Sequence, residues 1–125
     1  MTNTATIICA LTLWWEGRGE GFTGLQLIAD TIHNRQRGVY TADYVCRKPK
    51  QYSCWNGRTT VPEIPWNDPV FTGTCIPLAK KLVEGTYVPS TKATHYCRYD
   101  VFPSWRNTFA LVIKYKNHVF YKEKS

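Results

Sequence analysis

The sequence predicts a single α+β domain over residues 1–125, with helices first and a short β-hairpin toward the C-terminus. Three observations predict this fold class. The length suits one hydrophobic core and is short for two. No internal repeat, low-complexity tract or linker divides the chain. Apolar residues recur at helical spacing within residues 4–15, 23–37 and 77–85, whereas aromatic and polar residues alternate in the last third, as they do in strands.

The first helix is predicted over residues 4–15, where apolar residues recur every three or four positions. This segment is as apolar as the core of a signal peptide. However, no Lys or Arg precedes it, and Trp14 and Trp15 stand where a small-residue cleavage site would be. It is also shorter than the ~20 residues that a membrane-spanning helix needs. We therefore expect a buried helix of the mature fold, with no export signal and no stable insertion into a membrane.

Three closely spaced glycines follow the first helix. They predict that Glu16 stands at the end of this helix and that residues 18–20 form a tight connection. The second helix is predicted to begin at Thr23, a suitable N-cap residue, and to run to Arg37. Gly38 comes directly after it and is typical of a helix stop.

Residues 45–74 are rich in Pro, Gly, Asn and aromatic residues, and they are predicted to be irregular. A loop region of this length in a small domain often forms one wall of a cleft. Pro77 then predicts the first turn of a short helix, which Gly85 ends. Residues 109–115 and 118–121 are predicted to pair as a hairpin around the dipeptide between them.

The chain is basic, because 16 Lys and Arg against 9 Asp and Glu give a formal charge of +7. A cationic protein concentrates near polyanions, so nucleic acid, acidic membranes and anionic cell-wall polymers are candidate partners. The basic residues are scattered and form no run that is typical of a nucleic-acid-binding arm. Charge therefore narrows the class of partner and does not choose within it.

The number of cysteines also bears on the kind of site. An odd number without Cys-x-x-Cys pairs argues against a zinc ribbon or a complete disulfide framework. We expect several free, buried thiols with at most one bridge, and neither a metal ion nor an organic cofactor. The five residues are Cys9, Cys46, Cys54, Cys75 and Cys97.

The segment Glu16-Gly17-Arg18-Gly19-Glu20 holds the strongest candidate for catalysis. A carboxyl at a helix end beside Trp14 and Trp15 suits an apolar pocket, where desolvation disfavours its charged form. General-acid cleavage of a glycosidic bond requires a protonated carboxyl of this kind. In this interpretation Arg18 positions Glu20 or an acidic group of the ligand. The spacing leaves one alternative open, which is a pair of surface carboxylates that bind Arg18.

The segment 15–35, WEGRGEGFTGLQLIADTIHNR, resembles the opening of the cell wall hydrolase family that includes the spore cortex-lytic enzymes of the SleB type. That family has a Gly-Glu-Ala-Arg-Gly-Glu block, a downstream Gly-Gln, an apolar helix and a closing Asn-Arg. Here Trp15 and Gly17 replace the first Gly and the Ala of the block, and the helix closes on Asn34-Arg35. The Gly-Gln pair becomes Gly24-Leu25-Gln26.

Later motifs of the family follow in the same order, so the resemblance spans nearly the whole chain. These motifs are Gln-Phe-Ser, Thr-His-Tyr, Pro-x-Trp and a terminal His-x-Phe-Tyr. The matching residues here are Gln51-Tyr52-Ser53 with Trp55 close behind, Thr94-His95-Tyr96, Pro103-x-Trp105, and His118-Val119-Phe120-Tyr121. Each motif is short, but their order and spacing together are specific.

The resemblance implies a compact lysozyme-like α+β domain in which Glu16 lies at the base of a glycan cleft. It implies cleavage of the β-1,4 bond between N-acetylmuramic acid and N-acetylglucosamine in peptidoglycan. In lytic transglycosylases of the family, the muramic 6-hydroxyl attacks the anomeric carbon and leaves a 1,6-anhydro end. One carboxyl that acts first as acid and then as base suffices, so Glu20 is expected to support Glu16. Hydrolysis begins with the same protonated acid, and the sequence leaves both reactions open.

Further residues of these motifs are candidates for binding the substrate. They are Arg18, Ser53, Trp55, His95, Tyr96 and Trp105. The aromatic rings among them either stack on sugars or pack in the core. His95 either binds an N-acetyl group, stabilises an oxocarbenium-like state, or makes a structural hydrogen bond.

Two other classes of function stay open at this point. A Cys/His amidase or endopeptidase would need a reactive thiolate, for which Cys54 is the best candidate. A basic module that binds glycan or nucleic acid without catalysis would show salt-sensitive binding. The size and charge of the chain resemble those of a bacteriophage endolysin, while a prophage enzyme or a bacterial wall-remodelling enzyme stays open as an alternative. We therefore expect a monomer that acts on peptidoglycan strands, binds no nucleic acid, and passes from the host cytoplasm to the periplasm through a holin-made hole.

Overall fold

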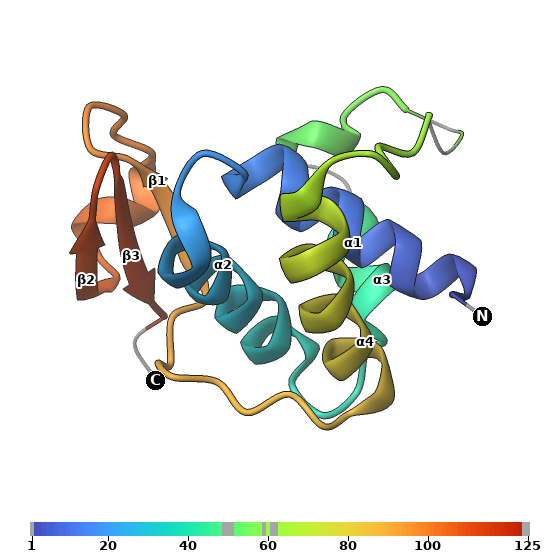
Figure 1. Cartoon of the computed structure of the whole chain (residues 1–125). Coiled ribbons are helices and arrows are strands. Elements are labelled where there is room, and N and C mark those ends of the chain that lie inside the picture. The colour runs from blue at the N-terminus through green and yellow to red at the C-terminus, as the bar shows by residue number, and fades with distance from the viewer. Residues whose placement is uncertain (1, 49–51, 59, 61–62, 124–125) are drawn as a thin grey trace.

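A computed structural model describes residues 2–48, 52–58, 60 and 63–123. In this part of the chain the helices come first and a three-stranded sheet comes last, so the predicted α+β order is confirmed. The sheet lies on one side of α2, and α1 and α4 lie on the other (Figure 1). In chain order the elements are α1 (Thr4–Gly17), α2 (Gly21–Gln36), α3 (Ala42–Arg47), η1 (Ser53–Trp55), η2 (Phe71–Cys75), α4 (Ile76–Glu84), β1 (His95–Arg98), η3 (Ser104–Asn107), β2 (Ala110–Tyr115) and β3 (His118–Lys122).

Helix α1 is the central element of the helical part, because it packs against α2, α3, α4 and η2. Its start is fixed by Asn3, whose side chain accepts a hydrogen bond of 2.8 Å from the backbone N–H of Thr6. It extends to Gly17, two residues beyond the predicted end, so Glu16 lies in its last turn. A Cβ at Gly17 would lie 2.6 Å from Cδ1 of Ile28, so any other residue here would displace the end of that side chain where α1 meets α2.

Helix α2 begins at Gly21, so the predicted N-cap at Thr23 is wrong. The N-cap is Glu20, and Thr23 lies exposed in the first turn. Gly21 has a φ of +77°, which explains why the reversal between the two helices is made at a glycine. The C-terminal end agrees with prediction to within one residue, since α2 ends at Gln36 and Arg37 takes the left-handed conformation.

One buried carboxylate fixes the chain between α4 and β1 onto α2. Asp30 is fully buried, and both of its oxygens accept hydrogen bonds from the segment 87–91. The donors include the hydroxyl of Tyr87 at 2.5 Å and that of Ser90 at 2.8 Å. Asn34 extends the same connection, since its side-chain amide donates to the backbone oxygen of Ala93 at 2.7 Å. These bonds determine where β1 begins, and therefore where the residues of the site lie.

The prediction that residues 45–74 are irregular is wrong in part. Helix α3 extends to Arg47, and η1 provides a further short helix. The π-helical η2 runs directly into α4, so the helical path begins before Pro77, the residue expected to start it. Gly85 ends α4 in the left-handed conformation, as predicted.

The sheet has the strand order β1-β3-β2, and both pairings are antiparallel. The predicted hairpin is confirmed, because β2 and β3 pair around a turn in which Lys116 has a φ of +52°. The third strand, β1, was not predicted. It pairs His95 with Tyr121 and Arg98 with His118, so the edge of the sheet next to the helices comes from the Thr-His-Tyr motif.

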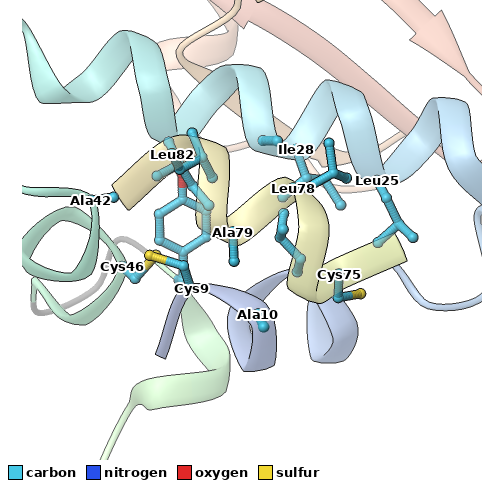
Figure 2. Packing of buried hydrophobic residues seen from close by; sticks show 14 of the residues in the cluster. Cys9, Ala10, Leu25, Ile28, Ala42, Cys46, Cys75, Leu78, Ala79 and Leu82 are labelled. Carbon is cyan, nitrogen blue, oxygen red and sulfur yellow. The ribbon is translucent and has the colours of Figure 1, made fainter. Parts of the chain in front are cut away.

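The hydrophobic core lies between α1, α2, α3 and α4 (Figure 2). Small side chains such as Ala10 and Ala79 are fully buried and let α1 and α4 pack closely. All five cysteines are free thiols, so the single bridge that the sequence left open is absent. The sulfur atoms of Cys9 and Cys46 lie 3.8 Å apart in the core. Within the described residues, no helix is long and apolar enough to span a membrane.

Candidate active site

Glu16 lies where the last turn of α1 meets strand β1. It is half-buried, and its carboxylate accepts a hydrogen bond from the hydroxyl of Tyr96. Cys54 of η1 lies beside it as well, because the charge of Glu16 is one of the causes that raise the pKa of this thiol. Three segments that are far apart in the sequence therefore meet at one carboxyl. The alternative of a surface carboxylate bound to Arg18 does not hold for Glu16.

Packing against two other aromatic rings fixes the position of Tyr96 and its hydroxyl. The Tyr96 ring packs against Phe120 at 5.4 Å and against Tyr52 at 6.5 Å between centroids. Tyr52 is itself buried, and its hydroxyl lies 2.8 Å from that of Thr31. Burial, followed by the charge of Glu16, raises the pKa of Tyr96 well above its usual range. Tyr96 therefore keeps its proton and remains a hydrogen-bond donor to Glu16.

Glu20 has a different partner. Its carboxylate lies 2.8 Å from Nδ1 of His118 on β3, and both side chains are largely buried. The backbone oxygen of Glu20 also accepts a hydrogen bond of 3.0 Å from Lys116. A Cβ at Gly24 would lie 2.4 Å from the Cβ of Glu20, so the glycine makes room for this side chain. Glu20 thus links the start of α2 to the hairpin.

The sequence suggested that Arg18 positions Glu20, but the structure shows that it does not. Its side chain is exposed, and its guanidinium carbon lies 4.1 Å from the centre of the Trp14 ring. This position leaves Arg18 at the surface of the helix end, close in sequence to Glu16 but turned toward Trp14. Binding of an acidic ligand group by Arg18 stays a prediction.

Trp55 lies in the core, so its ring has little surface to offer to a sugar. It is 5% exposed, and its indole N–H donates a hydrogen bond of 2.7 Å to the buried hydroxyl of Thr12. The ring also packs edge-to-face against Trp15, at 5.3 Å between centroids. Trp55 therefore supports the end of α1 that carries Glu16.

His95 and Trp105 lie in a second aromatic cluster and do not join Glu16. The His95 ring packs against Trp105 at 5.1 Å and Phe109 at 4.8 Å. Neighbouring residues of a strand point to opposite faces, so His95 points away from the side that Tyr96 presents to Glu16. Burial lowers the pKa of His95 to about 4, and Arg35 contributes to this shift, so the ring is neutral at neutral pH.

The remaining predicted residue is Ser53, which belongs to η1; its side chain lies outside the described part of the structure. The sequence did not predict that Cys54 lies beside Glu16, because it indicated this residue only as a candidate nucleophile. Its position inside the Gln-Tyr-Ser-Cys-Trp segment was the available signal. Among the described residues, no group of three or more His, Cys, Asp or Glu side chains is arranged to hold a metal ion.

Comparisons with known proteins agree with this architecture. The family model described as Cell Wall Hydrolase matches residues 19–121, a range that begins just after Glu16 and includes Glu20. The catalytic domain of the germination-specific lytic transglycosylase SleB from Bacillus anthracis has a similar structure, with a TM-score of 0.68. The two are 20% identical over 98% of this chain and 97% of that chain, which confirms the expected lysozyme-like α+β fold. No curated protein matches the sequence.

Proposed function

The chain belongs to the cell wall hydrolase family and degrades peptidoglycan, and we propose that it cleaves the β-1,4 bond between N-acetylmuramic acid and N-acetylglucosamine. In this proposal Glu16 is the general acid and base. The observation that carries it is the position of one half-buried carboxyl that receives a hydrogen bond from Tyr96, which is itself half-buried, at the junction of helices and sheet.

The reaction needs only this carboxyl. Protonated Glu16 transfers its proton to the glycosidic oxygen, and the bond from that oxygen to the anomeric carbon of the muramic sugar breaks. The carboxylate then accepts a proton from the attacking hydroxyl as the new bond to the anomeric carbon forms. Attack by the muramic 6-hydroxyl gives a 1,6-anhydro end, and attack by water gives a reducing end. The similar SleB domain comes from a lytic transglycosylase, which favours the first outcome.

Tyr96 fits this cycle because a hydroxyl serves both states of the acid. The hydroxyl donates a hydrogen bond to the charged carboxylate, and its oxygen accepts a hydrogen bond from the protonated carboxylic acid. Since Tyr96 keeps its own proton, it does not compete with the substrate for the proton of Glu16. Tyr96 is therefore a positioning residue in this proposal, and Glu20 is a structural one.

Mass spectrometry of the products tests the proposal. Purified sacculi are incubated with the protein, and the released fragments are analysed with and without borohydride reduction. Anhydro-muramic ends identify a transglycosylase, and reducible muramic ends identify a muramidase. Intact glycan strands with cleaved peptides would contradict both reactions and favour an amidase or endopeptidase. The Glu16→Gln variant is the negative control, because an amide cannot supply the proton.

The chain is further proposed to act as a bacteriophage endolysin that works as a monomer. Its charge of +7 attracts it to anionic wall polymers. In this proposal it reaches the wall through a holin-made hole. Expression in a Gram-negative host with and without a holin tests this route. Lysis that depends on the holin supports it, and equal lysis without one contradicts it. Gel filtration with light scattering tests the monomer.

A further inference from the structure

The loop that follows β1 exposes apolar side chains at the outer end of the sheet. Tyr99 and Val101 are each 47% exposed, and Phe102 is 75% exposed. This projecting loop, residues 99–102, extends beyond β1 on the side of the sheet that is far from α1 and α4 (Figure 1). Apolar side chains that gather at one exposed position in this way are typical of a binding surface.

Arg106 of η3 fixes the conformation of the projecting loop. Its Nη1 donates hydrogen bonds to the backbone oxygens of Tyr99 at 2.9 Å and Val101 at 2.6 Å. Its Nε donates to the hydroxyl of Tyr121 at 2.7 Å, and its guanidinium carbon lies 4.2 Å from the centre of the Phe102 ring. Because the loop is already ordered, a partner that binds it has less conformational entropy to remove.

Positive charge surrounds the exposed apolar groups. Lys114 of β2 places its Nζ 5.5 Å from the centre of the Tyr99 ring. Arg98 pairs with Asp100 at 3.1 Å, whereas no carboxylate in the described part of the chain forms an ion pair with Arg106 or Lys114. Three positive groups and one negative group leave this surface with a net charge of +2.

The surface lies on the face of the sheet that points away from the candidate active site. Arg106 bonds to Tyr121, and the preceding residue of β3, Phe120, packs against the Tyr96 ring that reaches Glu16. Neighbouring residues of a strand point to opposite faces, so Tyr121 and Phe120 separate the two regions. A partner bound at the projecting loop therefore leaves Glu16 uncovered.

We propose that the projecting loop, with Arg106 and Lys114, binds the surface of a bilayer that contains anionic lipids. Phe102 and Val101 enter the boundary between headgroups and acyl chains, while the two cations stay among the lipid phosphates. Nucleic acid and anionic wall polymers would use the cations but leave the apolar side chains in water. The contact is shallow and requires no membrane-spanning helix. It goes beyond the cleavage of peptidoglycan and does not depend on it.

Co-sedimentation with lipid vesicles tests the proposal. Vesicles of phosphatidylcholine with about one third phosphatidylglycerol are compared with vesicles of phosphatidylcholine alone, and we expect at least about fivefold tighter binding to the anionic ones. Phe102→Ala should weaken binding to the anionic vesicles about tenfold, because the largest apolar group of the loop is lost. Phe22→Ala is the matched control, since this phenylalanine of α2 is 59% exposed on another element, and it should bind like wild type.

A second pair of variants tests the charge. Lys114→Ala should lose about fivefold in binding to anionic vesicles and nothing in binding to neutral ones. Lys80→Ala, an exposed lysine of α4, is its control and should change binding by less than about twofold. Thermal melts show that all four variants fold.

Each other outcome overturns the proposal. It fails if wild-type protein does not bind the anionic vesicles, or binds neutral ones equally well. Equal losses in Phe102→Ala and Phe22→Ala mean that the loop is not the contact, and equal losses in Lys114→Ala and Lys80→Ala mean that only net charge matters. Weaker binding of Phe102→Ala to sacculi, with unchanged binding to vesicles, assigns the surface to the wall. The vesicles contain no peptidoglycan, so the result is independent of the proposed function.

Discussion

Glu16 and Glu20 are four residues apart in the sequence, yet the fold gives them different surroundings. Glu16 faces the hydroxyl of Tyr96 and the thiol of Cys54, which are neutral groups. Glu20 faces the imidazole of His118 at 2.8 Å. The break between α1 and α2 separates the two carboxylates, since Glu16 lies in the last turn of α1 and Glu20 is the N-cap residue of α2.

This difference separates a chemical task from a structural one. A neutral hydroxyl serves a carboxyl in both of its protonation states, which a group that gives and takes a proton requires. The imidazole of His118 lies at ion-pair distance from the carboxylate of Glu20, and the pair joins α2 to the sheet. A motif with two similar carboxylates therefore contains one acid and one structural link. Four predictions test this division.

The largest expected effect is the loss of activity in Glu16→Gln. The change keeps the size and shape of the side chain but removes the transferable proton, so turbidity clearance of sacculi should fall by at least about 10³-fold. Glu20→Gln is the matched control, with the same chemical change four residues away, and it should cost about tenfold or less. Initial rates at equal protein concentration check both, with thermal melts to show that both variants fold. Similar losses in the two variants would contradict the division of tasks.

A smaller effect is expected for Tyr96→Phe, which keeps the ring that packs against Tyr52 and Phe120. Only the hydrogen bond to Glu16 is lost, so the rate should fall about tenfold. Initial rates of clearance measure this loss, and thermal melts show whether the variant folds. A rate equal to that of wild type would show that the hydroxyl does not act on the acid.

The sequence predicted those parts of the fold whose causes are local. The first helix follows from apolar spacing, and the hairpin follows from alternation around a tight turn. Strand β1 was missed because its four residues become a strand only by pairing with β3, which comes much later in the chain. The start of α2 was misplaced because Thr23 has the right side chain for a cap, but the close packing at Gly17 and Gly24 makes the chain turn earlier.

The site shows the same limit. Glu16 could be singled out from its motif, and the resemblance supplied Tyr96 as a neighbour in function. That the Tyr96 hydroxyl reaches this carboxyl is a tertiary fact, as is the pairing of Glu20 with His118. Trp55 was a candidate for sugar binding because an aromatic ring near a motif is equally suited to stacking on a sugar and to packing in the core. Only the burial of the ring in the folded protein distinguishes the two roles.

His118→Ala should affect stability more than chemistry. It leaves the Glu20 carboxylate without its partner in a largely buried position, which should cost about 2 kcal/mol of folding free energy. The melting temperature should fall by roughly 6–10 °C, while lysis at about 20 °C stays within about threefold of wild type. His118→Gln restores a donor and should recover part of the stability. A large loss of lysis with an unchanged melting temperature would instead give the pair a role in catalysis.

The smallest effect is expected for Cys54→Ala, although Cys54 lies beside Glu16. Burial, followed by the negative charge of Glu16, raises the pKa of this thiol far above its usual range, so almost no thiolate forms at neutral pH. A nucleophilic cysteine needs the opposite surroundings, a cation or a helix start that lowers its pKa. In the described part of the chain, no hydrogen bond joins Cys54 to a histidine.

Lysis by Cys54→Ala should therefore stay within about threefold of wild type, and a thiol-alkylating reagent should leave the variant unaffected. Burial is the main cause that raises the pKa of Cys54 and keeps it protonated, and the charge of Glu16 adds to it. Loss of lysis in Cys54→Ala with full activity in Glu16→Gln would reverse the assignment and identify a thiol-dependent amidase or endopeptidase. A single pair of neighbouring substitutions thus decides which of the two groups performs the chemistry.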